Sequence, residues 1–199
     1  PGHLVYAYLG GNRVRYTPPF SYFILLISVW LLLYPVLGVS MEEMMQSAYE
    51  TGFGASTSEP MTDDQRNIAA MVMDTISSNM RIFSSLYIPI MAIYSVLFFP
   101  KLRFNFLESV VVFLYIYGFS HIIVMLEVVV YATLGSTQNL IFNLLTYVYL
   151  IYAYYKVSKP SRLIPGILRI ILMYLLAYLT YVIMIGFFSA IFAAIKLNT

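Results

Sequence analysis

Two ionisable side chains in one long apolar run are the residues of this chain best suited to chemistry. His121 and Glu127 both lie in the run 110–134, and Tyr117 precedes His121 by four residues. On a helix of 3.6 residues per turn, Tyr117 and His121 share a face, whereas His121 and Glu127 are about 120° apart. Ionisable groups in lipid are costly and often mark functional sites. The three residues are therefore a candidate intramembrane polar site, either a relay or ligand site facing the bundle interior or an ordinary interhelical hydrogen-bonded contact.

The other reactive residue types exclude several kinds of site. The chain has no cysteine, so it offers no thiolate ligand and no cysteine nucleophile. Its two histidines, His3 and His121, are far apart in the sequence, which argues against a two-histidine haem site. Neither can be aligned with a candidate serine in the predicted spans, which argues against a Ser-His-Asp triad. The pair Gly10-Gly11 lacks the lysine and helix pattern of a phosphate-binding loop. We therefore expect a protein that is not an enzyme, with no catalytic residue, no cofactor, no metal site and no nucleic-acid partner.

Composition indicates that lipid surrounds the elements that carry these residues. Of 199 residues, 61% are hydrophobic and 10% are charged, whereas a soluble domain has about 25% charged residues. A membrane-spanning helix needs about 20 apolar residues. Five runs qualify, the fourth only if Asn139 and Asn143 belong to it: 20–39, 82–99, 110–134, 140–155 and 168–195. The runs are continuous rather than alternating, so we predict an all-α transmembrane bundle of five spans and not a barrel.

Basic residues predict the orientation of this bundle. If all five runs span, eight basic residues share one side: Arg13, Arg15, Lys101, Arg103, Lys156, Lys159, Arg162 and Arg169. The opposite side carries most of the acidic residues, in the segment 40–81. The positive-inside rule then places the N-terminus in the cytoplasm. The predicted organisation is a cytoplasmic interfacial arm over 1–19 and a five-span domain over 20–199, in the inner membrane of a bacterium, with 40–81 as an outer loop.

The same basic residues are candidate contacts for anionic lipid headgroups, because polybasic segments at the membrane surface attract them. This candidate set comprises Arg13, Arg15, Lys101, Arg103, Lys156, Lys159 and Arg162. Membrane lipids are therefore the first expected partners. The same residues also satisfy the topology rule alone, so the set by itself indicates no particular lipid.

Capping boxes predict where several helices begin. Ser40 with Glu43 and Thr62 with Gln65 predict two amphipathic helices in the outer loop, and Asn105 with Glu108 predicts the start of the third span.

Three segments together resemble a family of uncharacterised bacterial polytopic membrane proteins, catalogued as a domain of unknown function. The first contains Tyr8-Leu9-Gly10-Gly11, Arg13, Arg15-Tyr16 and Pro19-Phe20; the second contains Asn105-Phe106, Glu108, Val111 and Phe113; the third is YLIYAYYKVSKPSR, residues 149–162. The resemblance implies a cytoplasmic zinc ribbon upstream of Pro1, consistent with a chain that does not begin with methionine. The family usually has a histidine after the glutamate matching Glu108, where this chain has Ser109. This departure weakens any metal or catalytic role there. A more distant similarity is to five-span proteins of the Yip1 type.

Three hypotheses about function follow. The first is an accessory or scaffold subunit of a larger membrane complex, with other membrane proteins as partners. The second is a small-solute, ion or proton transporter that uses Glu127 and His121. The third, an enzyme acting on lipid near Glu108 and Ser109, lacks the clustered acids and histidines that such chemistry needs. The tyrosine stripe Tyr174, Tyr178 and Tyr181 fits either a polar cavity or an aromatic belt with buried hydroxyls.

Overall fold

The described part of the chain is entirely helical. The computed structural model describes residues 2–11, 16–40, 78–135 and 139–197. Their helices are α1 (Gly2–Leu9), α2 (Pro19–Leu37), α5 (Met80–Phe98), the short 3-10 helix η2 (Pro100–Leu102), α6 (Phe106–Leu134), α7 (Asn139–Ser158) and α8 (Leu163–Leu197). Each of the five predicted runs thus corresponds to one helix. Asn139 and Asn143 do belong to the fourth, and the two helices predicted in the outer loop lie outside the described residues.

Four of these helices are long and apolar enough to cross a membrane. They are Pro19–Leu37, Phe106–Leu134, Leu140–Ser158 and Leu163–Ser189. The remaining predicted span is the shorter apolar helix Ile82–Phe98 within α5. Length and composition therefore show a membrane protein with four candidate spans, and the fifth crossing remains a prediction.

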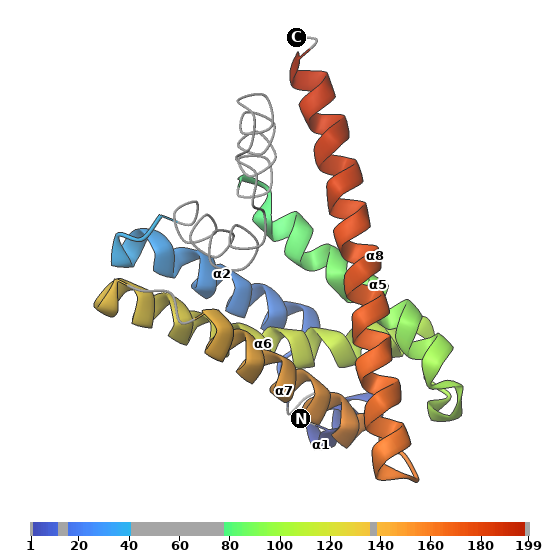
Figure 1. Cartoon of the computed structure of the whole chain (residues 1–199). Coiled ribbons are helices and arrows are strands. Elements are labelled where there is room, and N and C mark those ends of the chain that lie inside the picture. The colour runs from blue at the N-terminus through green and yellow to red at the C-terminus, as the bar shows by residue number, and fades with distance from the viewer. Residues whose placement is uncertain (1, 12–15, 41–77, 136–138, 198–199) are drawn as a thin grey trace.

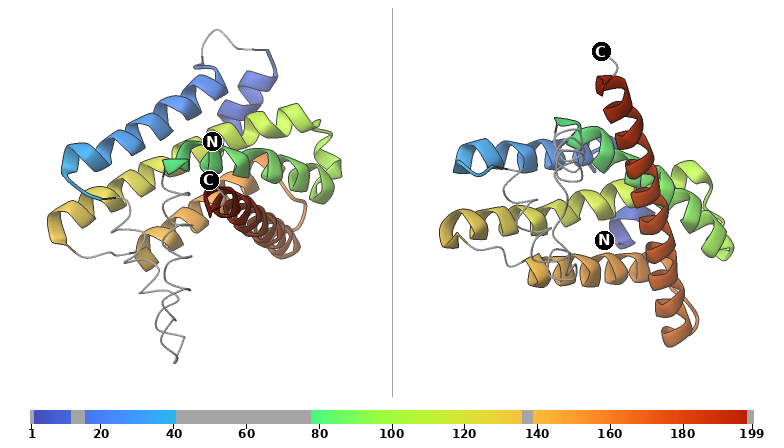
Figure 2. Two further views of the ribbon diagram at one scale, coloured as in Figure 1. Left: turned by 90° about the horizontal axis from the view of Figure 1, so that it is seen from above. Right: turned by 45° about the horizontal axis from the view of Figure 1, so that its top comes forward.

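Helix α6 is the centre of the bundle. It packs against α1, α2, α5 and α7, while α8 packs against α5 and α7. Half of the most apolar stretch of α6 is buried (50%), compared with 22% in α2, α7 and α8. Helices α2 and α6 run side by side in one direction and α7 runs back alongside them, whereas α8 crosses the others steeply (Figures 1 and 2). As a result, α7 and α8 diverge from their shared turn.

Local sequence explains the helix ends. The predicted capping box of α6 is confirmed: the Glu108 amide donates to Asn105 Oδ1 and the Asn105 amide donates to Glu108 Oε2, each at 2.8 Å. Pro19 occupies the first turn of α2, where the missing amide costs no hydrogen bond, and Gly38 ends that helix with φ 66°. The start of α6 and both ends of α2 are therefore specified by local residues.

A close approach holds α2 against α6. A side chain at Gly118 of α6 would place its Cβ 3.0 Å from Cε1 of Tyr22 in α2. Phe23, Ile27 and Trp30 of α2 are buried along this contact. The contact positions Trp30 beside His121, the residue singled out from the sequence.

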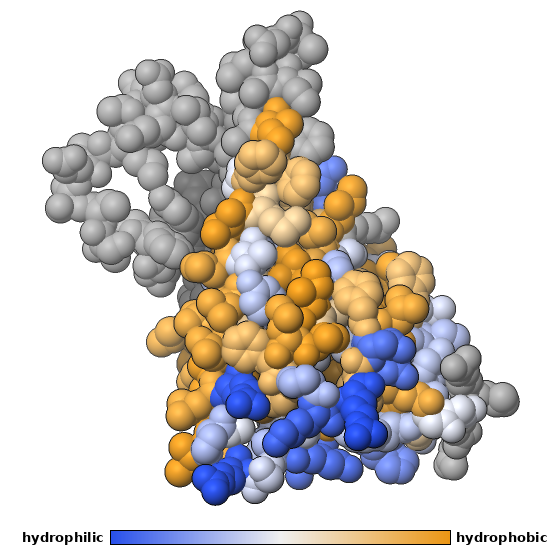
Figure 3. Space-filling model, turned by 90° about the vertical axis from the view of Figure 1, so that its right-hand side faces the viewer, coloured by the Kyte–Doolittle hydropathy of each residue, from blue (hydrophilic) through white to orange (hydrophobic). Residues whose placement is uncertain are grey.

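Hydrophilic side chains gather at one end of the bundle, below a surface covered with apolar ones (Figure 3). The turn between α7 and α8 and the segment η2 border one common cavity, so they lie at the same end. The exposed basic residues of these two connections are Lys101, Arg103, Lys156, Lys159, Arg162 and Arg169. The rest of the exposed surface is rich in Leu, Ile, Val and Phe, as expected of helices in lipid.

Candidate functional site

A polar cavity of about 250 Å³ lies inside the bundle, among α2, α5, α6, α7 and α8. We call it the bundle cavity. Its lining is rich in hydroxyl groups and has no formally charged side chain apart from the titratable imidazole: Trp30, Ser84, Tyr87, Tyr117, Ser120, His121, Val124, Asn143, Thr146, Tyr147, Leu150, Tyr178 and Tyr181. Tyr147 of α7 is 45% exposed and Tyr178 of α8 is 47% exposed. The bundle cavity is therefore open on the side where α7 and α8 diverge.

His121 forms part of the cavity wall and is fixed by its own helix. The ring is buried, and its Nδ1 lies 2.8 Å from the carbonyl oxygen of Tyr117. A carbonyl only accepts, so Nδ1 carries the proton and Nε2 of the neutral ring is an acceptor. Three rings pack edge-on against the imidazole, with centroids 5.1 Å away for Tyr117, 5.2 Å for Trp30 and 5.8 Å for Phe23. The arrangement makes His121 a rigid polar group in an aromatic setting.

Trp30 adds an indole donor to the same wall. Its Nε1 is buried and makes no hydrogen bond of good geometry, although the Tyr34 hydroxyl lies close to it. Leaving such a donor unpaired costs about 1–3 kcal/mol. A group that offers a hydroxyl or carbonyl to Trp30 Nε1 and a donor to His121 Nε2 would satisfy both. The chemistry of the cavity thus suits neutral polar groups with aromatic or apolar neighbours.

The three residues of the predicted polar site do not all meet in this cavity. Tyr117 and His121 share the cavity wall, as their four-residue spacing predicts. Glu127 is buried, with 7% of its surface exposed, but does not line the cavity. It lies instead within electrostatic reach of Tyr34 near the end of α2. The wide angle between His121 and Glu127 on one helix explains their separation.

Three tyrosine hydroxyls that do not line the cavity have structural partners. Tyr94 pairs with Thr180 at 2.8 Å and joins α5 to α8. Tyr154 pairs with Ser95 at 2.7 Å and joins α7 to α5. Tyr174 donates to the Leu150 carbonyl at 3.3 Å, whereas Tyr178 and Tyr181 of the same predicted stripe line the cavity. The stripe therefore serves both roles that its spacing allows.

A packed aromatic layer lies behind residues that line the bundle cavity, such as Tyr87. Tyr154 stacks on Phe113 with centroids 5.4 Å apart and rings 8° from parallel, and packs edge-on against Phe99 at 5.2 Å. The space beside it, shared by Tyr87 and Tyr174, has no room for a water molecule. Phe99 borders the cavity at the basic end, and Tyr87 borders the bundle cavity. The aromatic layer therefore lies between the bundle cavity and the cavity at the basic end.

The basic residues predicted to contact headgroups are divided between two hollows. Lys101, Lys159 and Arg162 border a cavity of about 460 Å³. Lys156 and Lys159 border a second hollow of about 380 Å³ beside α1. Arg103 is exposed and borders neither of these, and Arg13 and Arg15 lie outside the described residues. Lys159 borders both hollows, so the two hollows adjoin at the end of α7.

Helix α1 is held to the end of α7 by specific contacts. Tyr6 donates to the Val157 carbonyl at 2.7 Å, and Lys159 Nζ lies 4.6 Å from the centre of the Tyr6 ring. Burial raises the pKa of Tyr6 above its usual value, so the phenol keeps its proton at neutral pH. A Cβ at Gly2 would be 2.7 Å from the Lys156 carbonyl oxygen, so the start of α1 approaches the α7 backbone closely.

Arg169 and Ser158 also border the larger basic cavity and were not among the headgroup candidates predicted from the sequence. In the sequence analysis Arg169 serves only to orient the bundle; in the structure it lies in α8, which begins at Leu163. Ser158 carried no sequence signal; its buried hydroxyl has no hydrogen-bond partner. Ser109, which stands where the resembled family has histidine, is fully buried and borders neither the bundle cavity nor the basic cavities. Within the described ranges, no three His, Cys, Asp or Glu side chains come together as metal ligands would.

Comparison with known proteins gives a short family match. A family model described as a protein of unknown function (DUF3667) matches residues 1–31, which comprise α1 and the first two-thirds of α2. The comparisons with curated proteins and with solved structures found no match. The match is consistent with the resemblance carried by the first segment, and it assigns no activity.

Proposed function

We propose that this chain is a five-span protein of the bacterial inner membrane that acts without catalysis, as an accessory or scaffold subunit of a larger membrane complex. The observation that carries the proposal is the bundle cavity. It is hydroxyl-rich, and it opens between two helices that diverge. Side chains with hydroxyl and amide groups hold membrane helices together by hydrogen bonds across their interface. A partner helix that places polar and aromatic side chains between α7 and α8 would use this opening.

The exposed residues at the opening support the proposal that a partner protein binds there. Asn143, Tyr147 and Tyr178 are exposed on the described surface. An amide and phenol hydroxyls facing hydrocarbon lose hydrogen bonds that water would supply. A partner protein would restore these bonds, whereas lipid tails would not.

Photo-crosslinking tests the accessory role. Tyr178 is replaced by the photoreactive p-benzoylphenylalanine and the cells are irradiated before membranes are solubilised. We expect a discrete protein adduct from this position. The matched control is Ile183, which is 64% exposed and lies about 140° around the same helix. A monodisperse monomer in mild detergent, with no adduct from position 178, would reject the accessory role.

The five-span topology has its own test, which the absence of cysteine makes simple. Single cysteines are placed at Ser161, in the turn between α7 and α8, and at Ser58, in the segment predicted to be the outer loop. We expect an impermeant maleimide to label Ser161→Cys only from the cytoplasmic side and Ser58→Cys only from the outside. Labelling of both from one side would overturn the topology.

A transporter of a small neutral solute is the second candidate, and the aromatic layer at Tyr154 favours it. Two polar cavities separated by a layer without room for water resemble a closed pathway. In that case His121→Ala would abolish flux, because His121 borders the bundle cavity. Glu127→Gln would have a smaller effect, because Glu127 does not border it. Wild-type flux in both variants would reject this candidate.

A further inference from the structure

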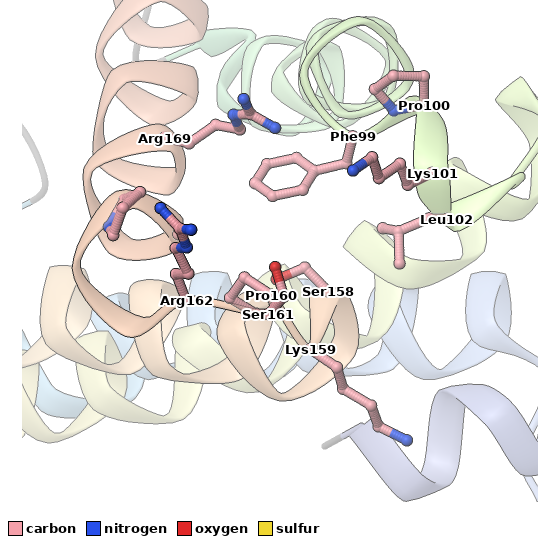
Figure 4. A pocket seen from close by; sticks show the side chains of 12 residues that line it. Phe99, Pro100, Lys101, Leu102, Ser158, Lys159, Pro160, Ser161, Arg162 and Arg169 are labelled. Atoms are coloured by element: carbon pink, nitrogen blue, oxygen red, sulfur yellow. The ribbon is translucent and has the colours of Figure 1, made fainter.

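The larger basic cavity, which we call the hairpin cavity, lies between the turn that joins α7 to α8 and the segment η2. Its volume is about 460 Å³, within the range of about 300–1,000 Å³ common for ligand pockets. Arg162 directly precedes α8 and Arg169 lies near its start, and Lys101 faces them from η2 across the ring of Phe99 (Figure 4). Three cationic groups from two separate chain segments therefore surround one space.

These three cations have no carboxylate to neutralise them in the described structure. Of the acidic residues, only Glu108 and Glu127 fall within the described ranges. Glu108 caps α6 by accepting from the Asn105 amide, and Glu127 is buried in the far half of α6. Like charges that converge repel one another, and an anion between them replaces this repulsion with attraction.

A buried hydroxyl is the second, independent feature of the hairpin cavity. Ser158 borders the cavity, is 8% exposed, and its Oγ has no hydrogen-bond partner. The first turn of α8 begins beside it at Leu163, and the amides at a helix start favour negative charge. Lys159 also borders the cavity, but its ammonium group points away to the Tyr6 ring. The donors that remain are Lys101, Arg162, Arg169 and Ser158.

Apolar residues on the same turns of α8 indicate how the anion is attached. Leu163, Ile164 and Leu168 are 58%, 70% and 60% exposed. All three lie between Arg162 and Arg169 in the sequence. A ligand that places a charged group in the cavity and a hydrocarbon chain on these residues would match both surfaces.

We propose that the hairpin cavity binds the phosphate group of an anionic membrane lipid. Lys101, Arg162 and Arg169 neutralise the phosphate, and the Ser158 hydroxyl donates to one of its oxygens. Guanidinium groups suit this task because their planar donors match phosphate oxygens in pairs. The site is independent of the bundle cavity and of the accessory role proposed for the chain.

Native mass spectrometry of the whole chain in detergent tests the site. Purified protein is titrated with phosphatidic acid and, separately, with phosphatidylcholine of the same acyl chains. We expect tighter retention of phosphatidic acid. Each of Lys101→Gln, Arg162→Gln and Arg169→Gln should weaken it about fivefold, and the triple variant on the order of 100-fold. The control Arg103→Gln removes the same charge just outside the cavity and should change binding less than about twofold.

The outcomes distinguish a specific lipid-binding site from non-specific attraction to a basic surface. Equal retention of phosphatidic acid by the triple variant would overturn the proposal, as would a loss in Arg103→Gln equal to that of the single cavity variants. Ser158→Ala distinguishes the loss of the binding site from misfolding of the protein. The hydroxyl that it removes has no partner in the protein, so the melting temperature should not fall. Binding of phosphatidic acid should nevertheless be weaker. A fall in melting temperature with unchanged binding would remove Ser158 from the site.

Competition with inorganic phosphate identifies the source of the anion. If the lipid is the ligand, millimolar inorganic phosphate leaves phosphatidic acid bound. If inorganic phosphate displaces it and shows the same dependence on Lys101, Arg162 and Arg169, the anion site stands and the lipid assignment is wrong.

Discussion

Gly166 lies directly against the ring of Pro160 at the turn between α7 and α8. A Cβ at Gly166 would come within 2.4 Å of Pro160 Cγ and 2.5 Å of Pro160 Cβ. No side chain fits there unless the turn moves. The angle at which α8 leaves α7, and with it the shape of the hairpin cavity, therefore depends on this glycine.

Gly166→Ala should lower the stability of the protein. Overpacking at a rigid proline ring costs about 1–3 kcal/mol, more than the helix propensity that alanine gains. Gly186→Ala is the matched control in the same helix, because nothing lies within 4 Å of its added Cβ. There alanine should be neutral or stabilising by up to about 1 kcal/mol. Thermal unfolding in one detergent compares the two, and equal shifts would show that Gly166 is not confined by Pro160.

The hydrogen bond between Ser95 and Tyr154 should couple α5 to α7 energetically. It is buried, measures 2.7 Å, and lies in the aromatic layer beside Phe113 and Phe99. Ser95→Ala and Tyr154→Phe, alone and together, form a double-mutant cycle. Hydrogen bonds between membrane helices give coupling of about 0.6–1.7 kcal/mol in such cycles. Unfolding in mixed detergent micelles measures it, and Tyr152→Phe, on the exposed surface of α7, is the control. Additive effects of the two changes would contradict the prediction.

The capping box at the start of α6 should stabilise the central helix of the bundle. Asn105→Ala removes the acceptor for the Glu108 amide and should cost about 1 kcal/mol. Asn105→Asp keeps that acceptor and should retain most of the stability, as should Glu108→Gln, because glutamine serves at the third position of a capping box. The free energy of unfolding of the three variants provides the test. A loss in Glu108→Gln equal to that in Asn105→Ala would show that charge, and not the reciprocal hydrogen bonds, is what matters.

Helix positions could be predicted because they depend on local pattern and on the thickness of a bilayer. All five apolar runs became helices, and Asn105 with Glu108 marked the start of α6 correctly. The short arm before Gly10 also became a helix, α1. The second run, predicted over 82–99, corresponds to the apolar helix Ile82–Phe98 within α5, which is shorter than the four candidate spans.

The cavities could not be predicted, because they depend on how helices distant in sequence meet. Spacing within α6 indicated that Tyr117 and His121 share a face, and they do. It contained no information on Trp30, which reaches His121 through the packing of α2 at Gly118. Likewise Lys101 and Arg169 are 68 residues apart and share a cavity only because α8 crosses α5. An angle between two helices is a property of side-chain packing over the whole interface.

Arg103 ends η2 in a left-handed conformation, with φ 54°. This conformation costs about 1–2 kcal/mol for a residue with a Cβ, and glycine would adopt it without strain. The greater freedom of glycine in the unfolded chain opposes this gain by about 0.4–1 kcal/mol. The net effect of Arg103→Gly should be a stabilisation of about 0.5–1 kcal/mol. Arg103→Ala removes the same charge but keeps the Cβ, so it should give none of this gain. Thermal unfolding of the two variants isolates the backbone effect. Equal stability of glycine and alanine at this position would show that η2 relaxes around Arg103 and stores no strain.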